Sequence, residues 1–86
     1  MTAVHVTAVL RPLVGGENTL EASGATLRAV VADLERQYPA LAGRIVDAVG
    51  LRPEVFLAID GEEAFSLDQQ VPVGAEVHIL PAIAGG

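Results

Sequence analysis

Residues 76–86 read EVHILPAIAGG, and this stretch decides how the rest of the chain is interpreted. Its first half is rich in apolar, β-favouring residues, which predicts a strand over residues 76–80. Pro81 has no backbone N–H to continue a sheet and can stand at the end of that strand. Gly85 and Gly86 follow without side chains that would obstruct a narrow passage. The stretch therefore predicts a last strand that presents a tail ending in a free carboxylate.

Further strands are predicted upstream, where apolar residues alternate with others or cluster between turn signals. They span residues 3–10, 19–22 and 54–59, with a short edge strand over 62–65. The turn formers in residues 11–16 predict a hairpin between the first two strands, and Asp60 with Gly61 predicts a tight turn after the third. Residues 67–74 are expected to be irregular.

One long helix is predicted between the two groups of strands. Thr26 is suited to cap its first turn, and Pro39 ends it because the residue before a proline is pushed out of the helical region. Between these positions, apolar residues recur on one helical face: Leu27, Val30, Val31, Leu34 and Tyr38. A shorter helical segment is predicted over residues 41–50.

A helix between two pairs of strands predicts an α+β fold in which one sheet packs one face against the helix. Alternation places the following residues toward the helix: Val4, Val6, Ala8, Leu57, Ile59, Val77 and Ile79. It places the following residues on the opposite, outward face: His5, Thr7, Phe56, Ala58, His78 and Leu80. With Pro81 and Ile83 after Leu80, the outward face is expected to carry a contiguous apolar patch, a feature typical of protein contact sites.

Length and composition narrow the possible functions. A chain of 86 residues forms one small domain, and the absence of cysteine excludes a thiolate nucleophile and a cysteine-based zinc site. The formal net charge of −6 disfavours nucleic acid and anionic membranes as partners. The sequence shows neither a signal-peptide pattern nor an apolar run approaching the ~20 residues that span a bilayer. We therefore expect a cytoplasmic protein that is a monomer when free.

No catalytic or metal-binding constellation is predicted. His5 and His78 are the only two histidines, and as isolated imidazoles on different strands they would need further ligands, which are not evident. Glu62 and Glu63 follow a turn and are expected to be solvated. We therefore expect a protein that is not an enzyme and that binds neither a metal nor a cofactor itself.

Short motifs give the chain a resemblance to a known family. The order of elements, with GATL at residues 24–27 and LPAIAGG at residues 80–86, resembles the ubiquitin-like β-grasp sulfur carriers of the MoaD/ThiS family. LRP at residues 10–12 and the LPAIAGG segment are most similar to the CysO-like carriers of actinobacteria. The resemblance covers essentially the whole chain. It implies a β-grasp domain over residues 1–81, with one main helix across a mixed sheet of four to five strands, and a flexible tail over residues 82–86 ending in Gly-Gly.

The resemblance also implies a function centred on Gly86. An E1-like adenylating enzyme would use ATP and Mg²⁺ to adenylate the Gly86 carboxylate, and a sulfur donor would then displace AMP to leave a thiocarboxylate. That group would donate sulfur to a biosynthetic synthase, for cysteine or another sulfur-containing metabolite. A terminal carboxylate with a pKa of ~3.5 is ionised and must be activated first, while Gly85 gives the tail clearance. The residues expected to contact partners are Phe56, His78, Leu80, Pro81 and Ile83.

Other functions share this architecture. The chain could be the small subunit of a molybdopterin-synthase-type complex, which is held tightly by its partner instead of acting as a shuttle. It could also be a ubiquitin-like modifier whose terminal glycine forms an isopeptide bond with another protein. An unrelated small enzyme is disfavoured because a catalytic constellation is missing. The sequence names neither the sulfur donor nor the client enzyme.

Overall fold

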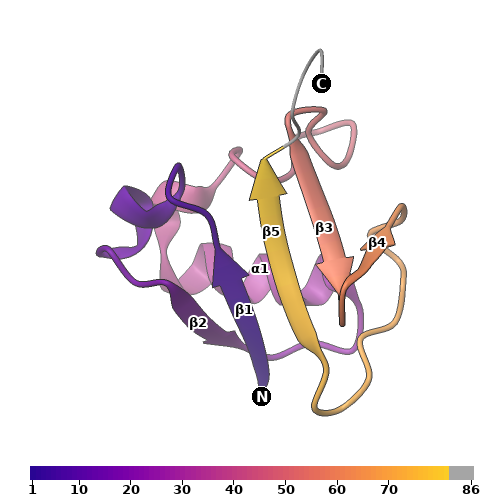
Figure 1. Ribbon diagram of the computed structural model, residues 1–86. Coiled ribbons are helices and arrows are strands. Elements are labelled where there is room, and N and C mark those ends of the chain that lie inside the picture. The colour runs from indigo at the N-terminus through magenta and orange to yellow at the C-terminus, as the bar shows by residue number, and fades with distance from the viewer. Residues whose placement is uncertain (82–86) are drawn as a thin grey trace.

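The computed structural model describes residues 1–81, which form one sheet with an α-helix across one face (Figure 1). The strands are β1 (Thr2–Val6), β2 (Thr19–Ala22), β3 (Val55–Ile59), β4 (Glu62–Ala64) and β5 (Glu76–Pro81). The helices are α1 (Leu27–Gln37) and two short 3₁₀ helices, η1 (Arg11–Val14) and η2 (Pro39–Leu41). Among the described residues, no helix is long and apolar enough to cross a membrane.

The sheet has five strands in the order β2-β1-β5-β3-β4, with β5 at its centre. β1 and β5 run parallel, whereas every other neighbouring pair is antiparallel. Parallel neighbours need a long crossover connection, and the chain between β1 and β5 supplies it and includes α1. This arrangement is the β-grasp fold, so the predicted α+β class, the mixed sheet and the single main helix are confirmed.

Both predicted hairpins are present. β1 and β2 pair so that Val4 lies opposite Leu20. β3 and β4 are joined by Asp60 and Gly61, whose φ angles of 51° and 87° both lie in the left-handed region. That backbone conformation is the one favoured in two-residue hairpin turns, and aspartate followed by glycine adopts it readily.

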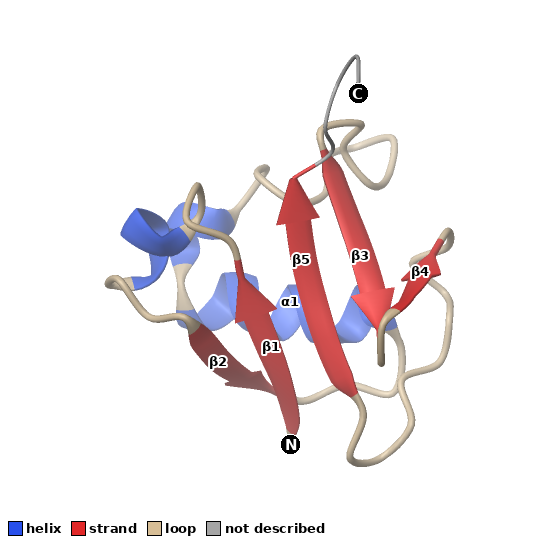
Figure 2. Cartoon of the chain, viewed as in Figure 1, coloured by secondary structure: helices blue, strands red, loops and turns tan. Residues whose placement is uncertain are grey.

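The inner face of the sheet and the helix share one aliphatic core, and α1 lies across the sheet from β2 to β3 (Figure 2). The helix begins at its predicted cap, since the Thr26 hydroxyl accepts a hydrogen bond from the Ala29 N–H at 3.2 Å. Its buried apolar residues are Leu27, Val30, Val31 and Leu34. The buried residues of the sheet that were predicted to face the helix are Val4, Val6, Leu57, Ile59, Val77 and Ile79. Burial of each such side chain contributes about 1.5–3 kcal/mol, which makes this core the main stabilising element.

The prediction that Ala8 faces the helix is wrong. β1 ends at Val6 instead of continuing to residue 10, and Ala8 lies exposed in a turn. The turn forms because the Thr7 carbonyl accepts hydrogen bonds from the N–H groups of Leu10 and Arg11, both at 3.1 Å. Leu10, not Ala8, therefore joins the core.

The predicted helical segment over residues 41–50 is also wrong, because past the end of η2 the chain continues through turns. The Asp47 carboxylate accepts hydrogen bonds from the N–H groups of Val49 (2.9 Å) and Gly50 (3.1 Å), which stabilise a turn and lower the pKa of Asp47. Ile45 is nevertheless fully buried. The helix-like spacing of apolar residues here reflects a loop that packs into the core.

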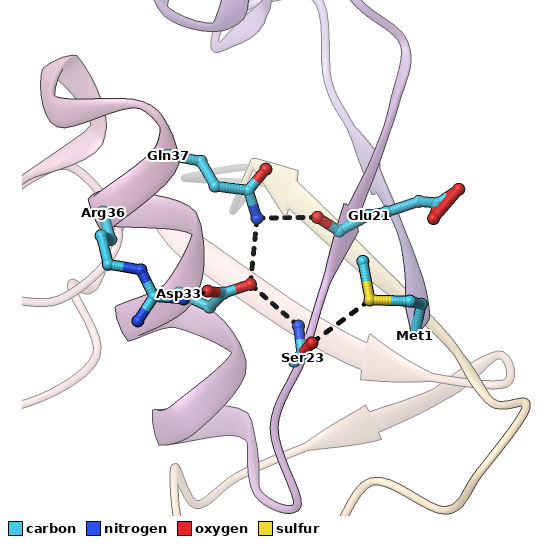
Figure 3. A network of polar contacts seen from close by, with 6 residues as sticks. All are labelled: Met1, Glu21, Ser23, Asp33, Arg36 and Gln37. Carbon is cyan, nitrogen blue, oxygen red and sulfur yellow. Dashed lines mark hydrogen bonds and ion pairs between the residues drawn. The ribbon is translucent and has the colours of Figure 1, made fainter.

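A buried carboxylate ties α1 to β2 (Figure 3). Asp33 is 7% exposed and accepts hydrogen bonds from the Ser23 N–H and the Gln37 side-chain amide, both at 2.9 Å. Gln37 also donates to the Glu21 carbonyl at 2.9 Å, and Arg36 forms an ion pair with Asp33. A buried charge is tolerated when it is paired and hydrogen-bonded, so this network holds the edge strand against the helix.

Replacing Asp33 with alanine is expected to lower the free energy of unfolding by about 1–3 kcal/mol, because the Ser23 N–H loses its partner. Urea unfolding followed by circular dichroism measures the difference. Asp68→Ala is the matched control, since Asp68 is exposed and forms a surface ion pair with Arg28, and such pairs contribute at most about 1 kcal/mol. Equal destabilisation by the two substitutions would contradict the role given to the network.

Candidate functional site

The tail begins at the end of the central strand. β5 is paired along both sides, and its last residues are held by β3, where Leu80 lies opposite Phe56 and Pro81 opposite Val55. The tail therefore starts from a fixed point on the sheet. Three of the predicted site residues lie outside the described part of the chain, so the predictions for them stay predictions: Ile83, Gly85 and Gly86.

An exposed apolar patch surrounds this point on the outer face of the sheet, the side turned away from α1. Phe56 and Leu80, opposite each other in the register, are 39% and 42% exposed. Pro81 follows Leu80 and is exposed at the end of the strand, where its register partner Val55 belongs to the core, so Pro81 lies at the border of this face. These three residues, named here the outer patch, confirm the predicted outward orientation of Phe56 and Leu80. Large apolar side chains that gather at one exposed place are typical of a surface that contacts another protein.

Ala58 was expected to extend this patch, and that expectation is wrong. It is only 8% exposed, although it shares the outer face. In the register it lies between His78 on β5 and Glu63 on β4. Since both neighbours have much longer side chains, the methyl group of Ala58 is shielded from solvent between them. The outer patch therefore stops at Phe56.

A pocket of about 330 Å³ adjoins the outer patch. Its apolar lining includes Leu10, Val55, Leu80 and Pro81. Its charged lining comes from the segment between η2 and β3 and comprises Arg44, Arg52 and Glu54. The pocket was missed in the sequence because this loop was predicted to be helical. Its composition suits a polypeptide segment that combines apolar and acidic side chains.

The side chain of Arg52, in the lining of this pocket, is held in place by its contacts. Arg52 donates a hydrogen bond to the Gly43 carbonyl at 3.1 Å and forms an ion pair with Glu54. The hydrogen bond from Arg52 lowers the pKa of the Glu54 carboxyl, and Glu54 in turn raises the pKa of Arg52. Arg52 and Glu54 therefore form an ion pair that is fixed in the loop beside the end of β5.

The two histidines lie together on the outer face. β1 and β5 pair so that His5 lies beside His78, and the two rings stack with centroids 4.4 Å apart and planes 15° apart. His5 Nε2 lies 2.6 Å from Glu76 Oε1, and His5 Nδ1 lies 3.3 Å from the Thr19 hydroxyl. The expectation of two isolated imidazoles is therefore wrong. Periodicity within each strand could not reveal that the first and last strands are neighbours.

The remaining acidic pair is exposed, as predicted. Glu62 and Glu63 both lie in β4, the edge strand of the sheet.

Within residues 1–81, the outer patch and the adjoining pocket together form a surface suited to docking. The carboxylate predicted to react belongs to the segment that leaves this surface at Pro81.

Comparison with known proteins identifies relatives of this chain. The model described as the ThiS family matches residues 4–86. The sulfur carrier protein CysO of Mycobacterium tuberculosis (strain ATCC 25618 / H37Rv) is 38% identical over 89 residues, covering 96% of each chain. A chain in the crystal structure of the Amycolatopsis orientalis BexX/CysO complex is 30% identical, with a TM-score of 0.91 over all of both chains. Small archaeal modifier protein 3 of Haloferax volcanii is 34% identical over 65 residues, 72% of this chain and 71% of its own.

Proposed function

This chain belongs to the ThiS family, and we propose that it is a sulfur carrier whose reactive group is the C-terminal carboxylate of Gly86. In this function partner enzymes bind the folded domain. The tail delivers the carboxylate, and later the thiocarboxylate, into their active sites. The protein is a co-substrate and carries out no catalysis of its own.

The point on the sheet from which the tail starts supports this proposal most directly. The tail leaves the central strand at Pro81, beside the outer patch, and five residues separate this point from the end of the sequence. Five fully extended residues span at most roughly 17 Å. A partner that docks on the outer patch can therefore place its reacting atoms within that distance, in a channel too narrow for bulky side chains. Gly85 and Gly86 suit such a channel because they have no Cβ.

The proposed chemistry has two steps. An oxygen of the Gly86 carboxylate attacks the α-phosphate of ATP, bound with Mg²⁺ in an E1-like enzyme, and pyrophosphate leaves. A sulfide-level donor then attacks the acyl carbon of the adenylate, and AMP leaves with one of the original carboxylate oxygens. The product is a thiocarboxylate, whose sulfur is then passed to a sulfur-accepting synthase. Activation is needed because a carboxylate with a pKa of ~3.5 is ionised at neutral pH and resists attack by an anion.

Partner contacts are assigned to the residues around the tail. Phe56, Leu80 and Pro81 offer the exposed apolar surface, and His78 borders it on β5. Ile83 is proposed to extend the same contact. A relative of this chain occurs in a complex with the protein BexX, which supports a function that depends on docking to larger enzymes.

Attachment to other proteins is the second candidate function. Similarity to small archaeal modifier protein 3 favours it, because a modifier uses the same terminal carboxylate. The two functions differ in the nucleophile that meets the activated Gly86, which is sulfide in a carrier and a lysine amine of another protein in a modifier.

Deletion of Gly86 is expected to abolish activation. With an E1-like enzyme, ATP and Mg²⁺, the full chain should stimulate pyrophosphate release. The deletion should reduce the rate at least about 100-fold, since a misplacement of about 1 Å can cost that much and one residue spans more. Urea unfolding of the two forms serves as the control for folding. Undiminished pyrophosphate release by the shortened chain would contradict the role of Gly86.

Leu80→Asp is expected to weaken docking without unfolding the domain. Leu80 is 42% exposed and lies opposite Phe56, so the unfolding free energy should fall by about 1–2 kcal/mol, which is too little to unfold the domain. Burying an unpaired carboxylate in an interface is costly, so the KM for the carrier in the activation assay should rise at least about tenfold. Val73→Asp, at an exposed loop position away from the outer patch, is the matched control. Equal effects of the two substitutions on KM, or unfolding by Leu80→Asp, would contradict the placement of the dock.

A further inference from the structure

Three side chains on the outer face form a cluster to which the sulfur-carrier function assigns no ligand. His5 comes from β1, while Glu76 and His78 come from β5, the strand beside it (Figure 1). One nitrogen from each imidazole and one oxygen from the carboxylate all lie within 4.8 Å of one another. Two imidazoles and a carboxylate make up a common ligand set for zinc, in which a fourth position stays open to water.

We propose that His5, Glu76 and His78 bind one divalent cation of the zinc type on the outer face of the sheet. Imidazole nitrogen favours zinc, copper and nickel, whereas Mg²⁺ and Ca²⁺ favour ligand sets made only of oxygen. The site therefore discriminates against the Mg²⁺ that the activating enzyme needs. Because all three side chains are partly or fully exposed, the fourth coordination position is open to solvent.

The backbone holds the three ligands in a suitable arrangement before a cation binds. Hydrogen bonding between β1 and β5 fixes His5 beside His78, and Glu76 lies two residues earlier on the same face of β5. Ligands on rigid strands lose little conformational freedom on binding, which favours affinity. Two zinc ligands in a tetrahedral site lie about 3.4 Å apart, so the three groups need only small side-chain movements to reach one ion.

Those movements are available to each side chain. His5 Nε2 and Glu76 Oε1 already point toward each other at 2.6 Å, and a cation would take the place of the proton between them. The His78 ring stacks on that of His5 and must turn about χ2, a torsion with a broad energy minimum. The Thr19 hydroxyl lies 3.3 Å from His5 Nδ1 and can accept a hydrogen bond from it once Nε2 binds the cation. Such a contact orients histidine ligands in metal sites.

The composition of the chain makes this inference easy to test. The sequence contains only these two histidines and no cysteine, so competing imidazole or thiolate ligands are absent. The formal net charge of −6 favours the approach of a cation. Any tight binding of zinc to the untagged chain in its carboxylate form must therefore involve His5 or His78.

Isothermal titration calorimetry with Zn²⁺ and the untagged chain is expected to show one saturable site. His5→Ala, His78→Ala and Glu76→Gln should each weaken binding at least about tenfold, since even partners that only orient metal ligands are worth that much. Glu21→Gln is the matched control, because Glu21 lies on the same face, separated from Glu76 by β1, and its loss changes the net charge equally. It should alter affinity less than about twofold, and Mg²⁺ should give no saturable binding.

Nuclear magnetic resonance gives a second readout. Zn²⁺ should shift the ring proton signals of both histidines over one titration curve, and His78→Ala should leave the His5 signal nearly unaffected at the same Zn²⁺ concentration. Absence of saturation at millimolar Zn²⁺, or full affinity in any of the three ligand variants, would overturn the proposal. Neither calorimetry nor nuclear magnetic resonance involves the activating enzyme, so the result of either experiment is independent of the sulfur-carrier function.

Discussion

The pairing of β5 with β1 on one side and β3 on the other is the constraint on which the rest of the structure depends. It buries Val77 and Ile79 against the helix and directs His78 and Leu80 outward. It also keeps the end of β5 in register with β3, so the tail starts from a fixed position. A shift of one residue in this register would exchange the two faces and lose both the core and the dock.

The two faces of the sheet have different roles: the inner face stabilises the fold, and the outer face is free for contacts with other molecules. The inner face and α1 supply the buried aliphatic surface that a domain of this size needs. The outer face is left for contacts, with the outer patch near the tail and a polar cluster around His5 farther along the strands. Under the proposed function, this division lets a small chain offer the Gly86 carboxylate to partner enzymes while its core stays intact.

Much of the fold could be predicted from local sequence patterns. The strand over residues 19–22, the turn at Asp60 and Gly61, and the cap at Thr26 were all predicted, because each depends on neighbours in sequence. Tertiary contacts decided the rest. The loop around Asp47 buries Ile45 without a helix, and the stacking of His5 on His78 depends on a parallel pairing of distant strands. Neither is encoded in the periodicity of a single segment.

Intact-mass spectrometry reveals whether Gly86 carries sulfur. The chain is incubated with an E1-like enzyme, ATP, Mg²⁺ and sulfide, and fragmentation then locates any change. We expect that one oxygen is replaced by sulfur and that the change maps to Gly86. An unchanged mass, with an enzyme that modifies another carrier in the same assay, would contradict it.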